Sequence, residues 1–121
     1  MKKKALVVDD NEQNRMLEKD LLDLAGFEIF EAENSTDGIA LAIKEKPDII
    51  IMDVRLPDIR GTDAAVILRN NKETSTIPIV FVTASVMADG LEEVRKIPNS
   101  TLISKPINTR TFANEISRFI I

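Results

Sequence analysis

The sequence contains no cysteine, no histidine, no tryptophan and no tyrosine. Without cysteine, the chain can form neither a disulfide nor a thiolate metal site, and it has no cysteine nucleophile. Without histidine, it lacks the imidazole that general acid–base catalysis and most transition-metal sites use. Its chemistry therefore has to come from carboxylates, lysines and hydroxyls, and carboxylates suit Mg²⁺ or Ca²⁺.

Long apolar runs and an excess of positive charge are also lacking. No apolar run approaches the roughly 20 residues that a membrane helix needs. The stretch between the N-terminal lysines and Asp9 is too short for a secretory signal, so we expect a cytoplasmic protein that does not act on membranes. The formal net charge of −4 argues against a nucleic-acid-binding surface.

The order of apolar segments predicts an α/β fold. Short β-rich runs, at 5–8, 27–31, 48–52, 77–82 and 101–104, alternate with segments of helical periodicity. The run 27–31 alternates apolar and polar residues, as a half-buried edge strand does, whereas 48–52 is apolar throughout, as a central strand is. Five such units with short connections predict one domain, a parallel sheet with helices on both faces.

Capping residues and apolar spacing predict how the helices begin, end and pack. Asn11 begins the first helix and Gly26 ends it; Asn34 or Ser35 begins the second, which ends before Pro47. A third helix is predicted over 62–70, a fourth within 86–97, and a fifth from Asn108 or Thr109. The stripes expected to face the sheet are Leu17, Leu21 and Leu24 in the first helix, Ile39, Ala40 and Ile43 in the second, and Phe112, Ile116 and Phe119 in the last.

Polar residues follow four of the predicted strands. They are Asp9 and Asp10 after the first, Asp53 after the third, Thr83 at the end of the fourth and Lys105 after the fifth. Ligands of parallel sheets bind outside the carboxyl ends of the strands, so these side chains should meet at one edge. Two carboxylates about 4 Å apart repel by roughly 4 kcal/mol at an effective dielectric near 20. Such a cluster calls for a cation, and Mg²⁺ would leave coordination positions open for a phosphate.

The same cluster is suited to phosphoryl transfer. A carboxylate can act as the nucleophile that accepts a phosphoryl group, and Asp53 lies between the acidic pair and the other two residues. Lys105 and Thr83 can bind phosphoryl oxygens. Taken singly, each residue has an ordinary explanation, such as a strand-end turn, a strand-forming residue or a solvated charge. Their occurrence together at the strand ends is what favours a site.

With these residues in place, the sequence resembles the receiver domains of bacterial two-component response regulators over its whole length. The motifs that carry the resemblance are Leu6-Val7-Val8-Asp9-Asp10-Asn11, the segment 47–57 around Asp53, Gly61, the segment 77–84 and Ser104-Lys105-Pro106. The length and the Ser-Lys-Pro-Ile segment look like the single-domain, DivK-like receivers. The resemblance implies that residues 1–121 form a single receiver domain of the flavodoxin-like fold, a parallel sheet in the order 2-1-3-4-5 with five helices.

The resemblance also implies a role for each site residue. Asp53 would be the phosphoacceptor. Mg²⁺, with Mn²⁺ as the alternative ion, would be held by Asp10, Asp53 and the main-chain carbonyl of Arg55, and Asp9 would act through water. Arg55 and Ser85 occupy positions that tune the lifetime of the phosphoryl group in this family.

On the other side of the site, Thr83 and Lys105 would contact the phosphoryl group, and the Lys105–Pro106 peptide bond would be cis. Receivers usually carry Tyr or Phe three residues before the lysine. Leu102 stands there and is the candidate switch residue. Pro98, Asn99 and Ser100 replace a common glycine turn.

The implied function is that of a stand-alone response regulator. A sensor histidine kinase or histidine phosphotransfer protein would donate the phosphoryl group. The fourth helix, fifth strand and fifth helix would bind a downstream effector protein, and the chain would be a monomer or weak homodimer. It would catalyse only its own phosphorylation and dephosphorylation, without nucleic acid or membrane as a partner.

Three alternatives remain open at this point. The chain could be a phosphorelay intermediate or phosphate sink without a switched output. A phosphatase of the haloacid dehalogenase type would need Asp-x-Asp, whereas the sequence has Asp53-Val54-Arg55. A flavodoxin-like nucleotide-binding protein would need a glycine-rich phosphate loop, and the four glycines are scattered.

Overall fold

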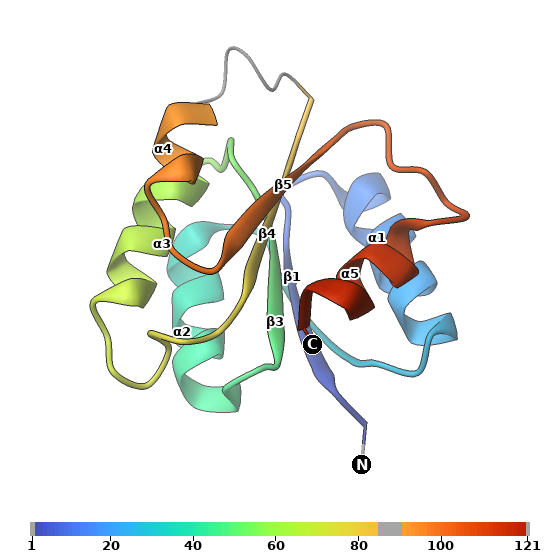
Figure 1. Ribbon diagram of the computed structural model, residues 1–121, viewed down its shortest axis with the longest axis horizontal. Coiled ribbons are helices and arrows are strands. Elements are labelled where there is room, and N and C mark those ends of the chain that lie inside the picture. Colours follow the sequence, from blue (N-terminus) through green and yellow to red (C-terminus); the bar gives the residue numbers. More distant parts are fainter. Residues whose placement is uncertain (1, 85–90, 121) are drawn as a thin grey trace.

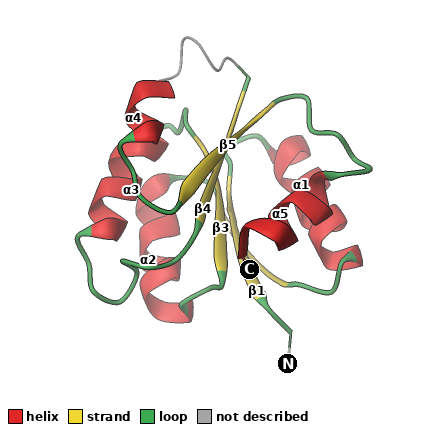
Figure 2. Ribbon diagram, viewed as in Figure 1, coloured by secondary structure: helices red, strands yellow, loops and turns green. Residues whose placement is uncertain are grey.

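Strands and helices alternate along the chain (Figure 2). The structure, a computed structural model, describes residues 2–84 and 91–120. The strands are β1 (Lys4–Val8), β2 (Glu28–Ala32), β3 (Ile49–Asp53), β4 (Ile79–Thr83) and β5 (Ser100–Ser104). The helices are α1 (Glu12–Leu24), α2 (Ser35–Glu45), α3 (Gly61–Arg69), α4 (Leu91–Arg95) and α5 (Phe112–Ile120). Each strand lies within one or two residues of the predicted range.

The strands form one parallel sheet in the order β2-β1-β3-β4-β5. Helices α2, α3 and α4 cover one face of the sheet, and α1 and α5 cover the other (Figure 1). The predicted fold and strand order are therefore confirmed, with β2 as an edge strand. No helix in the described ranges 2–84 and 91–120 is long and apolar enough to cross a membrane.

The core divides into two clusters because successive strand residues point to opposite faces. Leu6 and Val8 of β1 pack with α2, α3 and α4, whereas Ala5 and Val7 pack with α1 and α5. The central strands β3 and β4 are buried along their whole length. This rigid centre holds the carboxyl ends of β1, β3 and β4 in fixed positions relative to one another.

The predicted helix boundaries are confirmed where a capping residue marks them. The side chain of Asn11 accepts a hydrogen bond from the Asn14 amide at 3.0 Å, and that of Asn34 accepts one from the Asp37 amide at 2.8 Å. Gly26 follows α1 with φ of +96°, a conformation in which glycine is not strained. The prediction for α5 was early, because this helix begins at Phe112 and a turn precedes it.

The predicted inward face of α1 was wrong. Leu17 is 39% exposed and Leu24 is 86% exposed, while the buried positions are Arg15, Glu18 and Leu22. The cap at the end of β1 fixes the rotation of the helix, and that rotation turns two polar side chains inward beneath the strand ends. Hydrophobic spacing could not indicate this, because it counts only apolar residues.

The inward face of α2 was also misassigned by one position. Ala40 and Ile43 are exposed, whereas Ser35, Gly38 and Ala42 are buried. Small residues face the sheet here, so α2 packs closely against β1 and β2. The apolar residues of this helix therefore do not mark its buried side.

The turn before β5 uses asparagine where a glycine was expected. Asn99 has φ of 55°, in the left-handed region that asparagine tolerates better than most residues. Its side-chain amide donates to the Thr76 carbonyl at 3.0 Å, which holds this conformation. The preceding helix α4 covers Leu91–Arg95, and the earlier part of the predicted range, with Ser85, lies outside the described residues.

Candidate functional site

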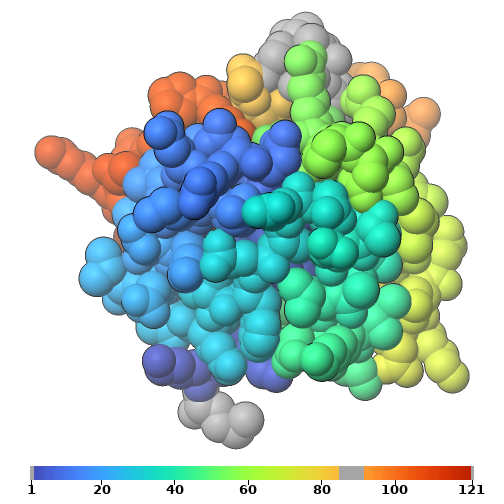
Figure 3. All heavy atoms as spheres, turned by 180° about the vertical axis from the view of Figure 1, so that it is seen from behind, coloured from blue at the N-terminus to red at the C-terminus, as the bar shows by residue number. Residues whose placement is uncertain are grey.

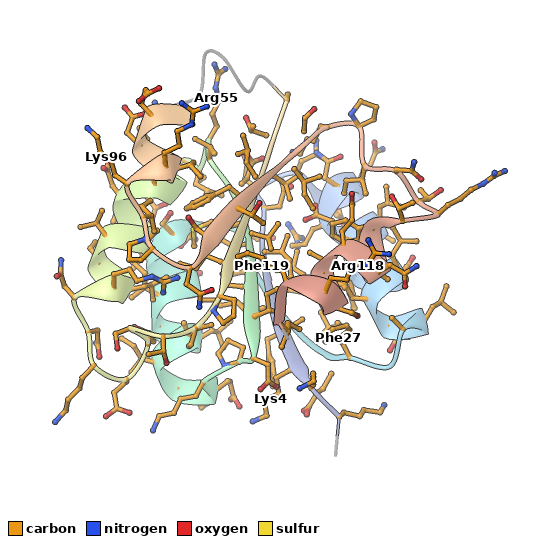
Figure 4. All side chains as sticks on the ribbon, in the orientation of Figure 1. Lys4, Phe27, Arg55, Lys96, Arg118 and Phe119 are labelled. Carbon is orange, nitrogen blue, oxygen red and sulfur yellow. The ribbon has the colours of Figure 1, made fainter. Side chains whose placement is uncertain are left out.

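The predicted site residues meet at one edge of the sheet. Asp9 and Asp10 follow β1, Asp53 ends β3, Thr83 ends β4 and Lys105 follows β5. All five positions lie at the carboxyl ends of parallel strands, where ligands of such sheets bind. Figure 4 shows the labelled side chain of Arg55, just after β3, at this same edge.

Three carboxylates form the acidic side of the site. One oxygen from each of Asp9, Asp10 and Asp53 lies within 4.8 Å of the others. The group is graded in exposure, because Asp9 is 1% exposed, Asp53 is 9% exposed and Asp10 lies open to solvent. An all-oxygen set, without thiolate or imidazole, matches the ligand preference of Mg²⁺, which keeps several waters. The residues therefore fit a divalent cation reached from solvent.

Lys105 supplies a positive charge inside this cluster. Its ammonium donates to Asp53 Oδ2 at 2.9 Å and to Asp9 Oδ2 at 3.4 Å. Burial alone would lower the pKa of Lys105, but the hydrogen bonds and charges of the two aspartates outweigh it and raise that pKa. Burial raises the pKa of Asp53, and hydrogen bonds from Lys105 and the Arg55 amide oppose the rise. Lys105 is thus charged and directed at the carboxylate expected to react.

Backbone groups fix the two buried aspartates. The Asn11 amide donates to Asp9 Oδ1 at 2.9 Å, and the Arg55 amide donates to Asp53 Oδ1 at 3.1 Å. Arg15 donates from Nη1 to the main-chain carbonyl of Asp9 at 2.9 Å. In each aspartate, one carboxylate oxygen is held by an amide and the other by Lys105. Both side chains are oriented by the fold before any ligand arrives.

Close packing behind Asp53 depends on Gly61. The Gly61 amide donates to the Val54 carbonyl at 2.8 Å, which turns the chain into α3. A Cβ atom at Gly61 would overlap the Asp53 carbonyl oxygen and crowd Val54. Glycine is therefore the residue that lets α3 begin directly beside the end of β3.

The other side of the site comes from β4 and β5. Thr83 is 1% exposed, and its carbonyl accepts a hydrogen bond from the Lys105 amide at 2.8 Å. This bond continues the pairing of β4 with β5 and holds Lys105 beside Thr83. The Lys105–Pro106 peptide bond is cis, in agreement with the resemblance.

Leu102 lies opposite Phe81 in the pairing of β4 with β5. Its side chain is partly buried and packs against the cluster beneath α2, α3 and α4. The residue therefore lies between the site and α4. Its role as a switch stays a prediction.

Glu18 is a site neighbour that sequence reasoning missed. It is 1% exposed, and burial raises its pKa to about 8, with a further contribution from Asp9. Its Oε2 has no hydrogen-bond partner among the described residues. A glutamate within an amphipathic helix is expected to face solvent, so the sequence gave no signal for this position.

Comparisons with known proteins agree with this geometry. The family model for the response regulator receiver domain matches residues 5–117. The polar-differentiation response regulator DivK of Brucella anthropi is 33% identical over 120 residues, covering 99% of this chain and 98% of that protein. DivK of Brucella ovis is 32% identical with the same coverage.

Solved structures show the same fold. The chemotaxis response regulator CheY4 of Vibrio cholerae superposes with a TM-score of 0.90 at 26% identity, covering 98% of this chain and 99% of that one. The receiver domain of the sensor histidine kinase PA1611 from Pseudomonas aeruginosa has a TM-score of 0.90 at 22% identity. That comparison covers 99% of this chain and 98% of the other, which has a magnesium ion coordinated in its active site cleft.

The family match covers nearly all of the sheet and the acidic pocket at its edge. Receiver domains are modules of two-component signalling that interact with histidine kinases. Members of the family are response regulators rather than enzymes with a separate substrate. The chain belongs to the response regulator receiver domain family.

Proposed function

We propose that residues 1–121 act as one receiver unit in which Asp53 accepts a phosphoryl group from a phosphohistidine and signals through phosphorylation-dependent protein contact. One observation carries the proposal. The Asp53 carboxylate lies within 4.8 Å of the Asp9 and Asp10 carboxylates on one side and 2.9 Å from the Lys105 ammonium on the other. A nucleophile between a cation-binding pair of acids and a fixed positive charge suits phosphoryl transfer.

In the proposed reaction, a carboxylate oxygen of Asp53 attacks the phosphorus of the donor. The phosphorus–nitrogen bond breaks, the histidine nitrogen keeps the electron pair, and an acyl phosphate forms on Asp53. Mg²⁺, held by Asp10, Asp53 and the main-chain carbonyl of Arg55, with Asp9 acting through water, supplies positive charge that offsets the charge of the phosphoryl oxygens. Such catalysis consists mostly of positioning and charge neutralisation.

Lys105 and Thr83 detect the product in this proposal. The ammonium of Lys105 is already directed at the Asp53 carboxylate and pairs with a phosphoryl oxygen after transfer. The Thr83 hydroxyl donates a hydrogen bond to another such oxygen. Both residues join β4 and β5 to the site, so their rearrangement shifts the population of conformations at the α4–β5–α5 face.

The relatives support the cellular setting of the proposal. DivK is named as a polar-differentiation response regulator, and the PA1611 receiver domain coordinates magnesium in its active site cleft. We place this chain in the cytoplasm, with a sensor histidine kinase or histidine phosphotransfer protein as donor and an effector protein as the recipient of the signal. It acts as a monomer or weak homodimer without contact to nucleic acid or membrane.

Acetyl phosphate labelling tests the site. Incubation with acetyl phosphate and Mg²⁺ should add one phosphoryl mass to the intact protein, and Asp53→Asn should abolish the addition because the nucleophile is gone. In a matched variant, Asp10→Ala, labelling should no longer respond to Mg²⁺. Label on the Asp53→Asn protein would overturn the assignment of the acceptor, and Mg²⁺-accelerated labelling of Asp10→Ala would overturn the metal role.

Affinity capture with and without beryllofluoride, a mimic of the phosphoryl group, separates a switch from a phosphate sink. A switch should retain a partner in one state and release it in the other. Equal capture in both states would favour the phosphorelay intermediate or sink.

A further inference from the structure

Glu18 occupies a position where a helix normally buries an apolar side chain. It lies on the inward face of α1, one turn before the fully buried Leu22, and is itself 1% exposed. Its Oε2 has no hydrogen-bond partner in the described part of the chain. An incompletely paired buried carboxyl destabilises a fold, and such exceptions cluster where they serve function.

The groups around Glu18 are those of the candidate site. Its side chain is hydrogen-bonded to Asp9 and is close enough to Lys105 and Asp53 to feel their charges. Asp9 Oδ1 accepts from the Asn11 amide, and Asp9 Oδ2 faces Lys105. Glu18 therefore approaches the Asp9 carboxylate from the protein interior, opposite the open side where Asp10 lies.

We propose that Glu18 is a positioning residue of the cation site, which backs the Asp9 carboxylate from inside and holds it toward the cation. This inference rests on the proposed function, in which Asp9 acts through a metal-bound water. A carboxylate in that role has to point in one direction, because the bound water has to match both the ion and the acid. Residues that orient such groups typically change metal affinity by 10–100-fold when replaced.

The competing explanation is that Glu18 only fills space beneath the pocket. Methionine is similar in volume and would fill the same space without an unpaired oxygen. A filler predicts that Glu18→Met leaves cation affinity unchanged. A positioning residue predicts opposite movements, with stability rising and cation affinity falling in the same variant.

Calorimetric titration with MnCl₂ at fixed pH separates the two explanations. Wild type, Glu18→Met and Glu18→Gln are compared, with Leu22→Met as a control on the same buried face. We expect about tenfold weaker binding or worse for Glu18→Met, and affinities near wild type for Leu22→Met. Glutamine keeps the shape and a hydrogen-bond donor, so Glu18→Gln should stay close to wild type. The urea midpoint of Glu18→Met without metal should exceed that of wild type.

Each failure has its own signature. If Glu18→Met binds Mn²⁺ as tightly as wild type, Glu18 is a filler and the inference is wrong. If Glu18→Gln weakens as much as Glu18→Met, hydrogen bonding to Asp9 does not set the affinity, which also overturns it. If wild type itself binds no Mn²⁺ and Asp53 is not labelled, the proposed function fails, and the inference fails with it.

Discussion

The segments on the two sides of Asp53 are held very differently. The loop after β3 is tied to α2, because Asp58 accepts hydrogen bonds from the Ser35 and Thr36 amides at 2.9 and 2.8 Å. The hydroxyl of Ser35 donates in return to the Ile59 carbonyl at 2.6 Å. The space-filling view from behind shows the α2 residues packed beside this segment (Figure 3). The chain that follows the acceptor is thus fixed at both ends.

The side formed by β5 and α4 has less packing. β5 is only partly buried along its length, whereas β3 and β4 are wholly buried. Arg69 holds the turn before β5 through the carbonyls of Pro98 and Asn99, at 2.9 and 3.1 Å, from an exposed position. Segments with fewer buried contacts open at lower free energy. The comparison teaches that the acceptor side is built for precise position and the β5 side for movement.

Gly61→Ala should break the ordered side most severely. The new Cβ overlaps the Asp53 carbonyl oxygen, so the backbone at the acceptor has to move. We expect a loss of about 3 kcal/mol in the free energy of unfolding, measured in urea, together with slower labelling by acetyl phosphate. Gly26→Ala is the control: φ of +96° strains alanine, but the site is distant and the space open. It should cost about 1 kcal/mol and leave labelling intact. A Gly61→Ala protein as stable as wild type would contradict the comparison.

A matched pair of leucines measures the difference in packing between the two sides. Leu68 of α3 is 1% exposed, whereas Leu102 of β5 is partly buried against the same cluster. Leu68→Ala should lower the free energy of unfolding by about 3 kcal/mol and Leu102→Ala by about 1 kcal/mol, because less apolar surface leaves the core. Denaturant unfolding of both variants checks this. Equal losses would mean that the β5 side is packed as tightly as the α3 side.

Ser35→Ala should give the smallest effect, at the contact between α2 and the loop after β3. Ser35 is fully buried, and alanine removes only the hydroxyl that donates to the Ile59 carbonyl. The free energy of unfolding should fall by about 1 kcal/mol, as for a typical buried hydrogen bond. Ser117→Ala, at an exposed position of α5, should change it by less than about 0.5 kcal/mol. If the two variants are equally stable, this contact does not hold the loop.

The sequence was sufficient for the sheet and for the residues at its edge. Apolar runs such as 48–52 identify buried strands, and parallel topology then brings Asp9, Asp53 and Lys105 together whatever the helices do. The resemblance supplied the strand order, which periodicity alone does not determine. These inferences depend on strong, redundant signals.

The packing of the helices was not accessible in the same way. Leu17 and Leu24 had the spacing of a buried stripe and are exposed, while Glu18 is buried. A helix buries the face that its caps and neighbours turn inward, and a polar residue there leaves no mark in a hydrophobic pattern. The same limit hid the contact of Asp58 with α2, because it joins residues more than 20 positions apart through amides that every residue has.

The Lys105 ammonium joins residues 96 and 52 positions away, at Asp9 and Asp53. Contacts of such sequence separation form late, after most of the chain has been ordered. A growing or partly unfolded polypeptide therefore contains the aspartates but not the assembled pocket. Phosphorylation of Asp53 would then report that the sheet is complete from β1 to β5, so that only fully folded molecules enter the signalling pool.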